Sequence, residues 1–214
     1  SVVQSKVSLD RVRKFLDRDE TQKYEVLTIC RNRIGFKNAT LGWDRDKSSE
    51  FRLKGLNIDF RVGELNVVVG PTGSGKTALL LGLLGELDLL DGKVYVPSLT
   101  PRDELETEHD GLTDSVAYCS QNPWLLNSTI KENIVFNERY DAARYNKVIE
   151  ACGLTRDFGI MDAGDQTEIG EKGVNLSGGQ KQRISLARAL YSSSRHVLLD
   201  DCLSAVDSHT AVWI

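Results

Sequence analysis

The spacing of apolar and polar residues changes several times along the chain, and these changes predict alternating strands and helices. Short apolar runs and one partly alternating stretch predict strands at 36–40, 53–60, 65–69, 92–96, 115–119 and 196–199. Apolar residues three and four positions apart predict helices at 78–87, 129–134, 141–152 and 177–191. The run 65–69 ends in three valines, so a buried strand is expected there. Strands interleaved with helices are typical of an α/β fold.

The first twenty residues form a charged segment with helical spacing. Val12, Phe15 and Leu16 lie three and four positions apart, as on one face of a helix. Two interpretations stay open for this segment. It is either a surface helix or, because its polar positions are rich in lysine and arginine, a helix close to a membrane surface.

Capping residues predict where three helices begin. Asn127 or Ser128 is the expected cap of the helix near residue 130. Asp141 is the expected cap of the next helix, which Gly153 ends. Ser177 is a good N-cap for the last predicted helix.

One glycine-rich stretch after the predicted strand 65–69 matches G-x-x-x-x-G-K-[ST], the phosphate-binding P-loop. Glycines let backbone N–H groups approach phosphate oxygens, and the following helix start adds partial positive charge. The lysine contacts the β- and γ-phosphates, and the threonine hydroxyl binds Mg²⁺. We therefore expect ATP and Mg²⁺ at Gly70, Pro71, Thr72, Gly73, Ser74, Gly75, Lys76 and Thr77.

Three further features suit nucleotide binding. The predicted strand 196–199 ends in Asp200 and Asp201, and an acidic residue at a strand end supports Mg²⁺ in P-loop proteins. Trp43 is either a packing residue or an aromatic face on which adenine stacks. Gly178 and Gly179 at a helix start are either part of a capped helix or a second phosphate-binding element.

Composition excludes several classes of function. Lysine and arginine total 27 against 31 acidic residues, so the net charge of −4 does not favour a nucleic-acid partner. The four cysteines are scattered and are expected to be reduced thiols, and His109, in an acidic loop at 97–114, is assigned no metal. The sequence has no signal peptide and no apolar run of about 18 residues, so the chain is expected to be soluble as given, cut from a larger membrane protein.

These motifs, in this order, resemble the nucleotide-binding domain of an ABC transporter. The pentapeptide LSGGQ at 176–180 is similar to the family signature, and Gln121 and Asp200 match the Q-loop glutamine and the Walker B aspartate. Residues 204–207 look like the D-loop, and 167–173 resemble the loop that contacts transmembrane coupling helices. The resemblance implies a P-loop NTPase core, an antiparallel β subdomain and an α-helical subdomain that carries the signature.

Finer features resemble the first nucleotide-binding domain of the multidrug-resistance-associated C subfamily. These features are residues 7–12, 133–136 and 200–207, while the acidic loop and Cys202 look like fungal members. The resemblance implies a linker at 1–20 after a transmembrane domain. It also implies a nucleotide-binding domain at 21–214, incomplete at its C-terminus, with a helical subdomain at about 122–185.

The resemblance also implies a shared catalytic arrangement. Two such domains close head to tail, so that Ser177, Gly178, Gly179 and Gln180 contact the nucleotide of the partner domain. Gln121 contacts Mg²⁺ and signals to the transmembrane coupling helices, and Asp200 holds Mg²⁺ through water. Asp201 stands where the family has a glutamate that orients the attacking water, which implies weakened hydrolysis. His209 is too close to the D-loop to be the switch histidine.

The expected function is therefore ATP-driven export at the cytosolic face of a vacuolar or plasma membrane, with the isolated chain monomeric. A regulatory domain that binds nucleotide with little turnover is the first alternative, and Asp201 leaves it open. A soluble ABC ATPase of translation or DNA repair is the second. The acidic pI of about 5.5 counts against it, as does the short separation between Gln121 and Leu176.

Overall fold

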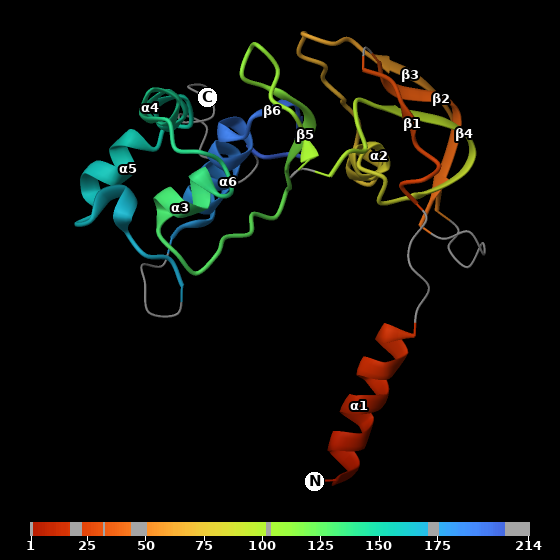
Figure 1. Ribbon diagram of the computed structural model, residues 1–214, viewed down its shortest axis with the longest axis horizontal. Helices are drawn as coiled ribbons and strands as arrows, with labels where there is room; N and C mark the ends of the chain where they lie inside the picture. The colour runs from red at the N-terminus through yellow and green to blue at the C-terminus, as the bar shows by residue number, and fades with distance from the viewer. Residues whose placement is uncertain are drawn as a thin grey trace.

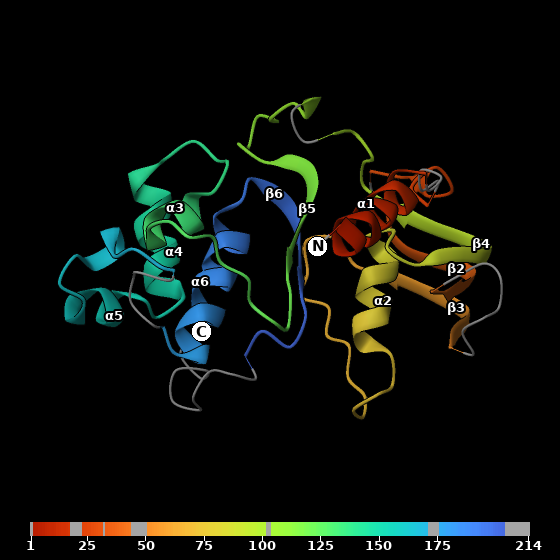
Figure 2. The ribbon, with the colours of Figure 1, turned by 90° about the horizontal axis from the view of Figure 1, so that it is seen from below.

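The computed structural model shows two groups of elements with a parallel pair of strands between them (Figures 1 and 2). One group is a four-stranded sheet with a helix packed against it, and the other is a cluster of helices. Together they confirm the expected α/β fold. The structure describes residues 2–17, 23–31, 33–43, 51–101, 104–170 and 176–203.

The four-stranded sheet has the order β1-β4-β2-β3, in which β1 is parallel to β4 and the other pairs are antiparallel. Helix α2 packs against it and buries Ala78, Leu79 and Leu83 in a core with Phe36 and Leu41. A methyl group on Gly82 would lie 2.5 Å from Leu41 Cδ1, so a residue without a side chain permits this close approach. The elements are β1 (Thr28–Ile29), β2 (Ile34–Gly42), β3 (Arg52–Phe60), α2 (Lys76–Leu83) and β4 (Asp88–Val96).

The parallel strands β5 (Thr113–Cys119) and β6 (Ser194–Leu199) lie between the two cores. Val197 packs against the helical core, whereas the next residue, Leu198, packs against the core of the four-stranded sheet. Alternate residues of a strand face opposite sides, so β6 contacts both groups of elements. Its C-terminal end therefore lies where the two groups meet.

The helical group buries the apolar faces that the sequence predicts. Asp141 caps α4, with its carboxylate 2.7 Å from the backbone nitrogen of Arg144, and Gly153 follows the helix with a positive φ of 63°. The cap of α3 is Thr129, so the expected Asn127 or Ser128 was wrong. Thr129 forms a reciprocal capping box with Glu132, which neither alternative is spaced to form. The elements are α3 (Ile130–Val135), α4 (Ala142–Ala151), α5 (Thr155–Ile160), a 3₁₀ turn (Gly164–Gln166) and α6 (Gly178–Tyr191).

The expected buried strand at 65–69 is not formed. Leu65 and Val69 are 87% and 85% exposed, and the segment is irregular between β3 and the P-loop. A β-branched run favours extended backbone, but a strand also needs a hydrogen-bonded neighbour, and residues 65–69 belong to neither sheet in the described part of the chain. The helix predicted at 78–87 is also shorter, because it ends at Leu83 and β4 begins at Asp88.

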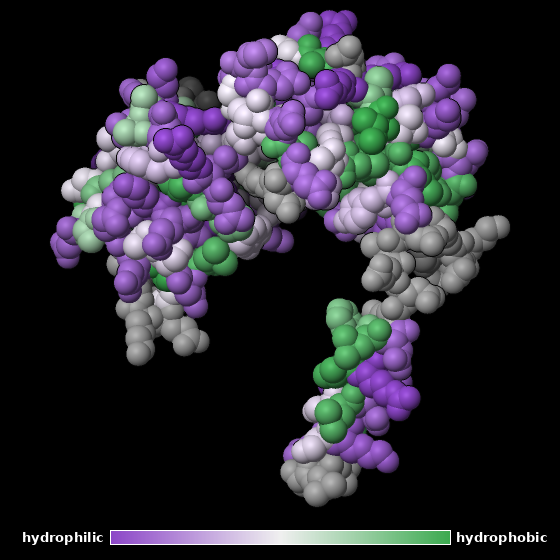
Figure 3. All heavy atoms as spheres, in the orientation of Figure 1, coloured by the Kyte–Doolittle hydropathy of each residue, from purple (hydrophilic) through white to green (hydrophobic). Residues whose placement is uncertain are grey.

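The predicted N-terminal helix is α1 (Val2–Leu16), which projects away from the other elements in Figure 1. Leu9, Val12, Phe15 and Leu16 are all more than half exposed, and Figure 3 shows an apolar stripe along this helix. Among the described residues, no helix combines the length and the hydropathy that a membrane span needs.

Candidate nucleotide-binding site

The P-loop connects the irregular segment 65–69 to the start of α2. Gly75 precedes the helix with φ 92° and ψ 18°, a left-handed conformation that glycine adopts without strain. It offers no side-chain cap to the first turn. The first N–H groups of a helix have no carbonyl partner within the helix, so this end presents donors to an anion.

Lys76 turns back over the loop that precedes it. Its Nζ donates to the carbonyl oxygens of Gly70 and Pro71, at 2.8 and 3.0 Å. The ammonium group is therefore held above the loop and beside the helix start. A full positive charge next to uncapped N–H donors fits the phosphates of a nucleotide.

A buried carboxylate lies next to the P-loop. Asp200, at the end of β6, is only 5% exposed, and its Oδ1 accepts a hydrogen bond of 3.1 Å from the Thr77 hydroxyl. Its Oδ2 accepts a second bond of 3.0 Å from the Tyr118 hydroxyl. A threonine hydroxyl beside a carboxylate is a hard-oxygen set that suits Mg²⁺. The structure thus brings together Thr77 and Asp200, which are 123 positions apart.

Burial and the hydrogen bond to Asp200 raise the pKa of Tyr118 to about 12. The phenol is therefore protonated at neutral pH and acts as the hydrogen-bond donor to the carboxylate. Sequence reasoning did not identify Tyr118. The one signal available was its place on a strand three residues before Gln121.

The predicted catalytic pair also meets. Gln121 Nε2 donates to Asp201 Oδ2 at 3.1 Å, although the two residues are 80 positions apart. Asp201 has a positive φ of 47°, a conformation that aspartate tolerates better than most residues. The side chain of Gln121 is thus placed at the carboxylate that follows the Walker B strand.

Trp43 lies just beyond the end of β2 and is 46% exposed. Its ring centroid is 6.4 Å from that of Phe51, and a methyl group on Gly75 would lie 3.5 Å from Phe51 Cζ. The Phe51 ring therefore lies between Gly75 of the P-loop and the exposed indole of Trp43. Phe51 was missed by sequence reasoning because it lies outside any motif.

We expect Trp43→Ala to weaken ATP binding by about 1–3 kcal/mol if adenine stacks on the indole. Trp43→Tyr should restore much of that loss, because it keeps an aromatic face. Titration with labelled ATP measures the change. Trp124→Ala is the matched control, since Trp124 is also exposed, at 52%, and packs against Arg188 in the helical group. Normal ATP affinity in a folded Trp43→Ala protein would leave Trp43 a packing residue.

The signature residues begin α6. Ser177 caps the helix through a reciprocal capping box with Gln180, with bonds of 3.2 and 2.9 Å. The Gln180 amide also donates to Asp157 of α5 at 2.9 Å, and Asp157 forms an ion pair of 2.5 Å with Arg183. These contacts fix the helix start against α5. The roles of Asp157 and Arg183 were not visible from the motif.

The two predicted phosphate-binding elements lie in different parts of the structure. Figures 1 and 2 show α2 beside the four-stranded sheet, whereas the start of α6 belongs to the helical group. Lys76 and Thr77 converge with Asp200, but no described contact joins Ser177, Gly178 or Gly179 to the P-loop. Three sequence predictions concern residues outside the described part of the chain. They are the D-loop at 204–207, residues 171–173 of the loop expected to contact the coupling helices, and His209.

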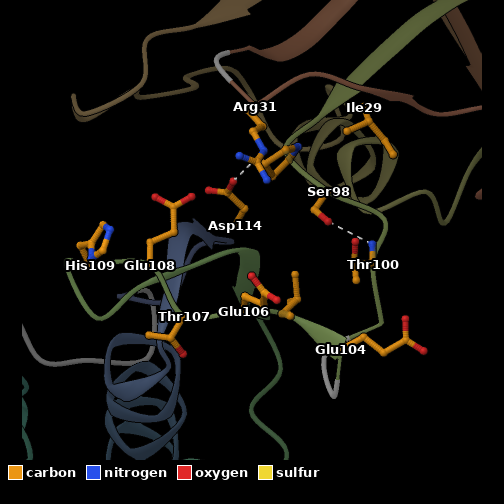
Figure 4. Close-up of a pocket in the computed structure, with 12 residues that line it drawn as sticks. Ile29, Arg31, Ser98, Thr100, Glu104, Glu106, Thr107, Glu108, His109 and Asp114 are labelled. Carbon is orange, nitrogen blue, oxygen red and sulfur yellow. Dashed lines mark hydrogen bonds and ion pairs between the residues drawn. The ribbon is translucent and has the colours of Figure 1, made fainter.

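A cavity of about 780 Å³ lies away from the P-loop, beside the acidic loop. Figure 4 shows Glu104, Glu106 and Glu108 among the residues that line it, together with Arg31 and Asp114. Arg195 also contacts this loop, through ion pairs with Glu108, Asp110 and Asp114. No group of three or more side chains suited to hold a metal occurs among the described residues.

Comparisons with known proteins agree with this geometry. A family model described as ABC transporter matches residues 53–204. The ATP-dependent bile acid permease of Saccharomyces cerevisiae is 66% identical over 215 residues, which cover 100% of this chain and 13% of the permease. The pleiotropic ABC efflux transporter of multiple drugs YBT1 of Candida glabrata is 62% identical, with 100% and 13% covered. The ABC transporter ATP-binding protein/permease VMR1 of S. cerevisiae is 64% identical, with 99% and 14% covered.

The chain thus spans about one seventh of the length of these relatives. The matched family region contains the P-loop, Gln121, the signature and Asp200. The chain belongs to the ABC transporter family, as a nucleotide-binding domain of fungal type.

Proposed function

We propose that this domain binds MgATP and hydrolyses it slowly to drive export by a fungal ABC transporter of the C subfamily. The observation that carries the proposal is the contact of Thr77 in the P-loop with the buried Asp200 on β6. The names of two relatives, a bile acid permease and an efflux transporter of multiple drugs, support transport. The resemblance of residues 7–12, 133–136 and 200–207 to the C subfamily supports that assignment.

Each group of this site has a defined task in the proposal. Residues 70–77 bind the phosphates through backbone N–H groups and Lys76, and Trp43 stacks with adenine. Thr77, Asp200 and Gln121 hold Mg²⁺, which neutralises charge on the β- and γ-phosphates. Asp201 orients the attacking water at its carboxylate oxygens. Binding thus depends on groups other than Asp201.

Slow hydrolysis follows from the length of Asp201. Aspartate is one methylene shorter than glutamate, and its Oδ2 is engaged by Gln121 at 3.1 Å. A water-orienting carboxylate must lie within about 2.6–3.2 Å of the water that it activates. We infer that ATP remains bound at this site over many cycles. A regulatory domain with no useful turnover is the second candidate, and the same shortened carboxylate favours it.

The proposed assembly has two nucleotide-binding domains that close head to tail. Residues 177–180 contact the nucleotide on the partner's P-loop, which agrees with the separation of α6 from α2 within one chain (Figures 1 and 2). Residues 167–173 contact the transmembrane coupling helices, and 1–20 link the domain at 21–214 to a transmembrane domain. The helical subdomain is 122–185. In this proposal the domain lies at the cytosolic face of a vacuolar or plasma membrane, and the isolated chain is monomeric.

Lys76→Ala tests the proposal at the level of binding. The substitution removes a charge-assisted contact, so we expect MgATP affinity to fall by roughly 1.5–3 kcal/mol. Equilibrium titration of the purified chain with labelled ATP measures it. Lys93→Ala, an exposed lysine on β4, is the matched control and should bind normally. Equal MgATP affinity in wild type and Lys76→Ala would show that the P-loop does not bind the phosphates of ATP.

A further inference from the structure

We propose that Tyr118 is a positioning residue that orients the carboxylate of Asp200 toward Thr77 and Mg²⁺. The inference rests on the proposed function and adds a residue that no motif of the chain contains. Its basis is the pair of hydroxyl contacts on one carboxylate, at 3.1 Å from Thr77 and 3.0 Å from Tyr118.

Strand geometry brings the phenol to this carboxylate. Ala117 and Cys119 of β5 are buried in the helical core. Alternation along a strand therefore turns Tyr118 to the opposite face. The partner of Tyr118 on β6 is Leu198, which packs against the core of the four-stranded sheet that also contains α2. Tyr118 thus lies on the face of β5 that is turned away from the helical core, toward Asp200 and the P-loop.

Strand β5 makes hydrogen bonds with both the backbone and the side chain of Asp200. The backbone N–H of Asp200 donates to the carbonyl oxygen of Cys119 at 2.9 Å, one residue beyond Tyr118. The phenol then fixes Oδ2, so the rotation of the carboxylate is determined and Oδ1 is directed to Thr77. Because the group is 5% exposed, water cannot readily replace a lost donor.

Positioning of this kind acts on the metal rather than on the phosphates. Outer hydrogen bonds that orient a ligand of a metal typically change metal affinity by 10- to 100-fold. In the proposed site, Lys76 and the backbone of the P-loop bind the phosphates, and Lys76 is held by the Gly70 and Pro71 carbonyls rather than by Asp200. Loss of the Tyr118 hydroxyl should therefore reduce only the part of ATP affinity that depends on Mg²⁺.

Tyr118→Phe tests the inference, because it removes the hydroxyl and keeps the ring. Labelled ATP is titrated into the purified 214-residue chain with Mg²⁺ and with EDTA, and Mn²⁺ binding to the ATP complex is followed by electron paramagnetic resonance. We expect the Mg²⁺-dependent gain in ATP affinity to fall about tenfold, and affinity in EDTA to change less than twofold. Mn²⁺ affinity should fall in parallel.

Tyr145→Phe is the matched control. Tyr145 also donates to a carboxylate at 3.0 Å, that of Asp165, but it lies in the helical group. We expect this variant to keep the full Mg²⁺ dependence. An Asp200→Asn background supplies a second comparison, in which Tyr118→Phe should have no further effect on metal dependence, because Tyr118 acts through Asp200.

Three results would overturn the inference. They are an unchanged Mg²⁺-dependent gain in Tyr118→Phe, an equal loss of affinity in EDTA and in Mg²⁺, and additive losses in the Asp200→Asn background. A wild-type chain that binds no ATP in either buffer would instead overturn the proposed function itself, and the inference with it. The titration in EDTA thus distinguishes a failure of the Tyr118 inference from a failure of the proposed function.

Discussion

Asp201→Glu is expected to raise ATP hydrolysis at this site by about 100-fold in the full-length transporter. The added methylene carries the carboxylate toward the attacking water, and a misplacement of about 1 Å can cost on the order of 100-fold in rate. ATP affinity should stay the same, because Lys76, Thr77 and Asp200 are unchanged. Single-turnover conversion of bound labelled ATP to ADP measures the rate.

Asp201→Asn is the control for this substitution. Asparagine keeps the size of the side chain and tolerates the positive φ of 47°, but it removes the negative charge. We expect it to bind ATP and to hydrolyse even less than wild type. Glutamate is less suited to this backbone conformation, so Asp201→Glu should lower the free energy of unfolding by about 1 kcal/mol. Hydrolysis in wild type as fast as in Asp201→Glu would show that the aspartate is already a competent base.

Ser177→Arg is expected to impair the nucleotide site built on the partner's P-loop by roughly tenfold or more. The long side chain fills the space where the signature would contact the partner's γ-phosphate, and it removes a hydrogen bond to a charged group. This domain's own P-loop is separate from α6 and should bind ATP normally. Site-specific nucleotide trapping in the full-length transporter distinguishes the two sites.

Ser177 also caps α6, so helix stability needs its own control. Ser177→Asn keeps a favourable N-cap and does not add bulk, and it should retain most of the trapping. Ser177→Ala loses the cap at a cost of about 1 kcal/mol without blocking the interface. A defect confined to this domain's own site would contradict the head-to-tail arrangement.

The features that could be predicted from the sequence are those that depend on neighbouring residues. The caps at Asp141 and Ser177 follow from side chains that accept hydrogen bonds from N–H groups three residues later. The P-loop followed by a helix from Lys76 is equally local, because the glycines and the helix start are consecutive. Local chemistry also explains the error at α3, where Thr129 rather than its two predecessors forms the capping box.

The features that could not be predicted depend on contacts between distant residues outside the recognised motifs. The contact of Thr77 with Asp200 is different, because both residues belong to motifs that already assigned them to one site. The run 65–69 has the composition of a strand, yet composition does not supply a pairing partner. Tyr118 meets Asp200 only because β5 pairs with β6 in one register. Phe51 near Trp43 and Asp157 at Gln180 likewise follow from packing across segments. The order of residues in the sequence does not reveal any of these contacts.

Retention of pre-bound ATP in the wild-type transporter shows whether hydrolysis at this site is slow. The full-length protein is loaded with labelled azido-ATP, chased with unlabelled ATP, cross-linked at intervals and cleaved between its two nucleotide-binding domains. We expect that label on this domain persists over many turnovers and is recovered as ATP, whereas label on the partner domain is exchanged through ADP. Equal rates of loss as ADP from both domains would contradict it.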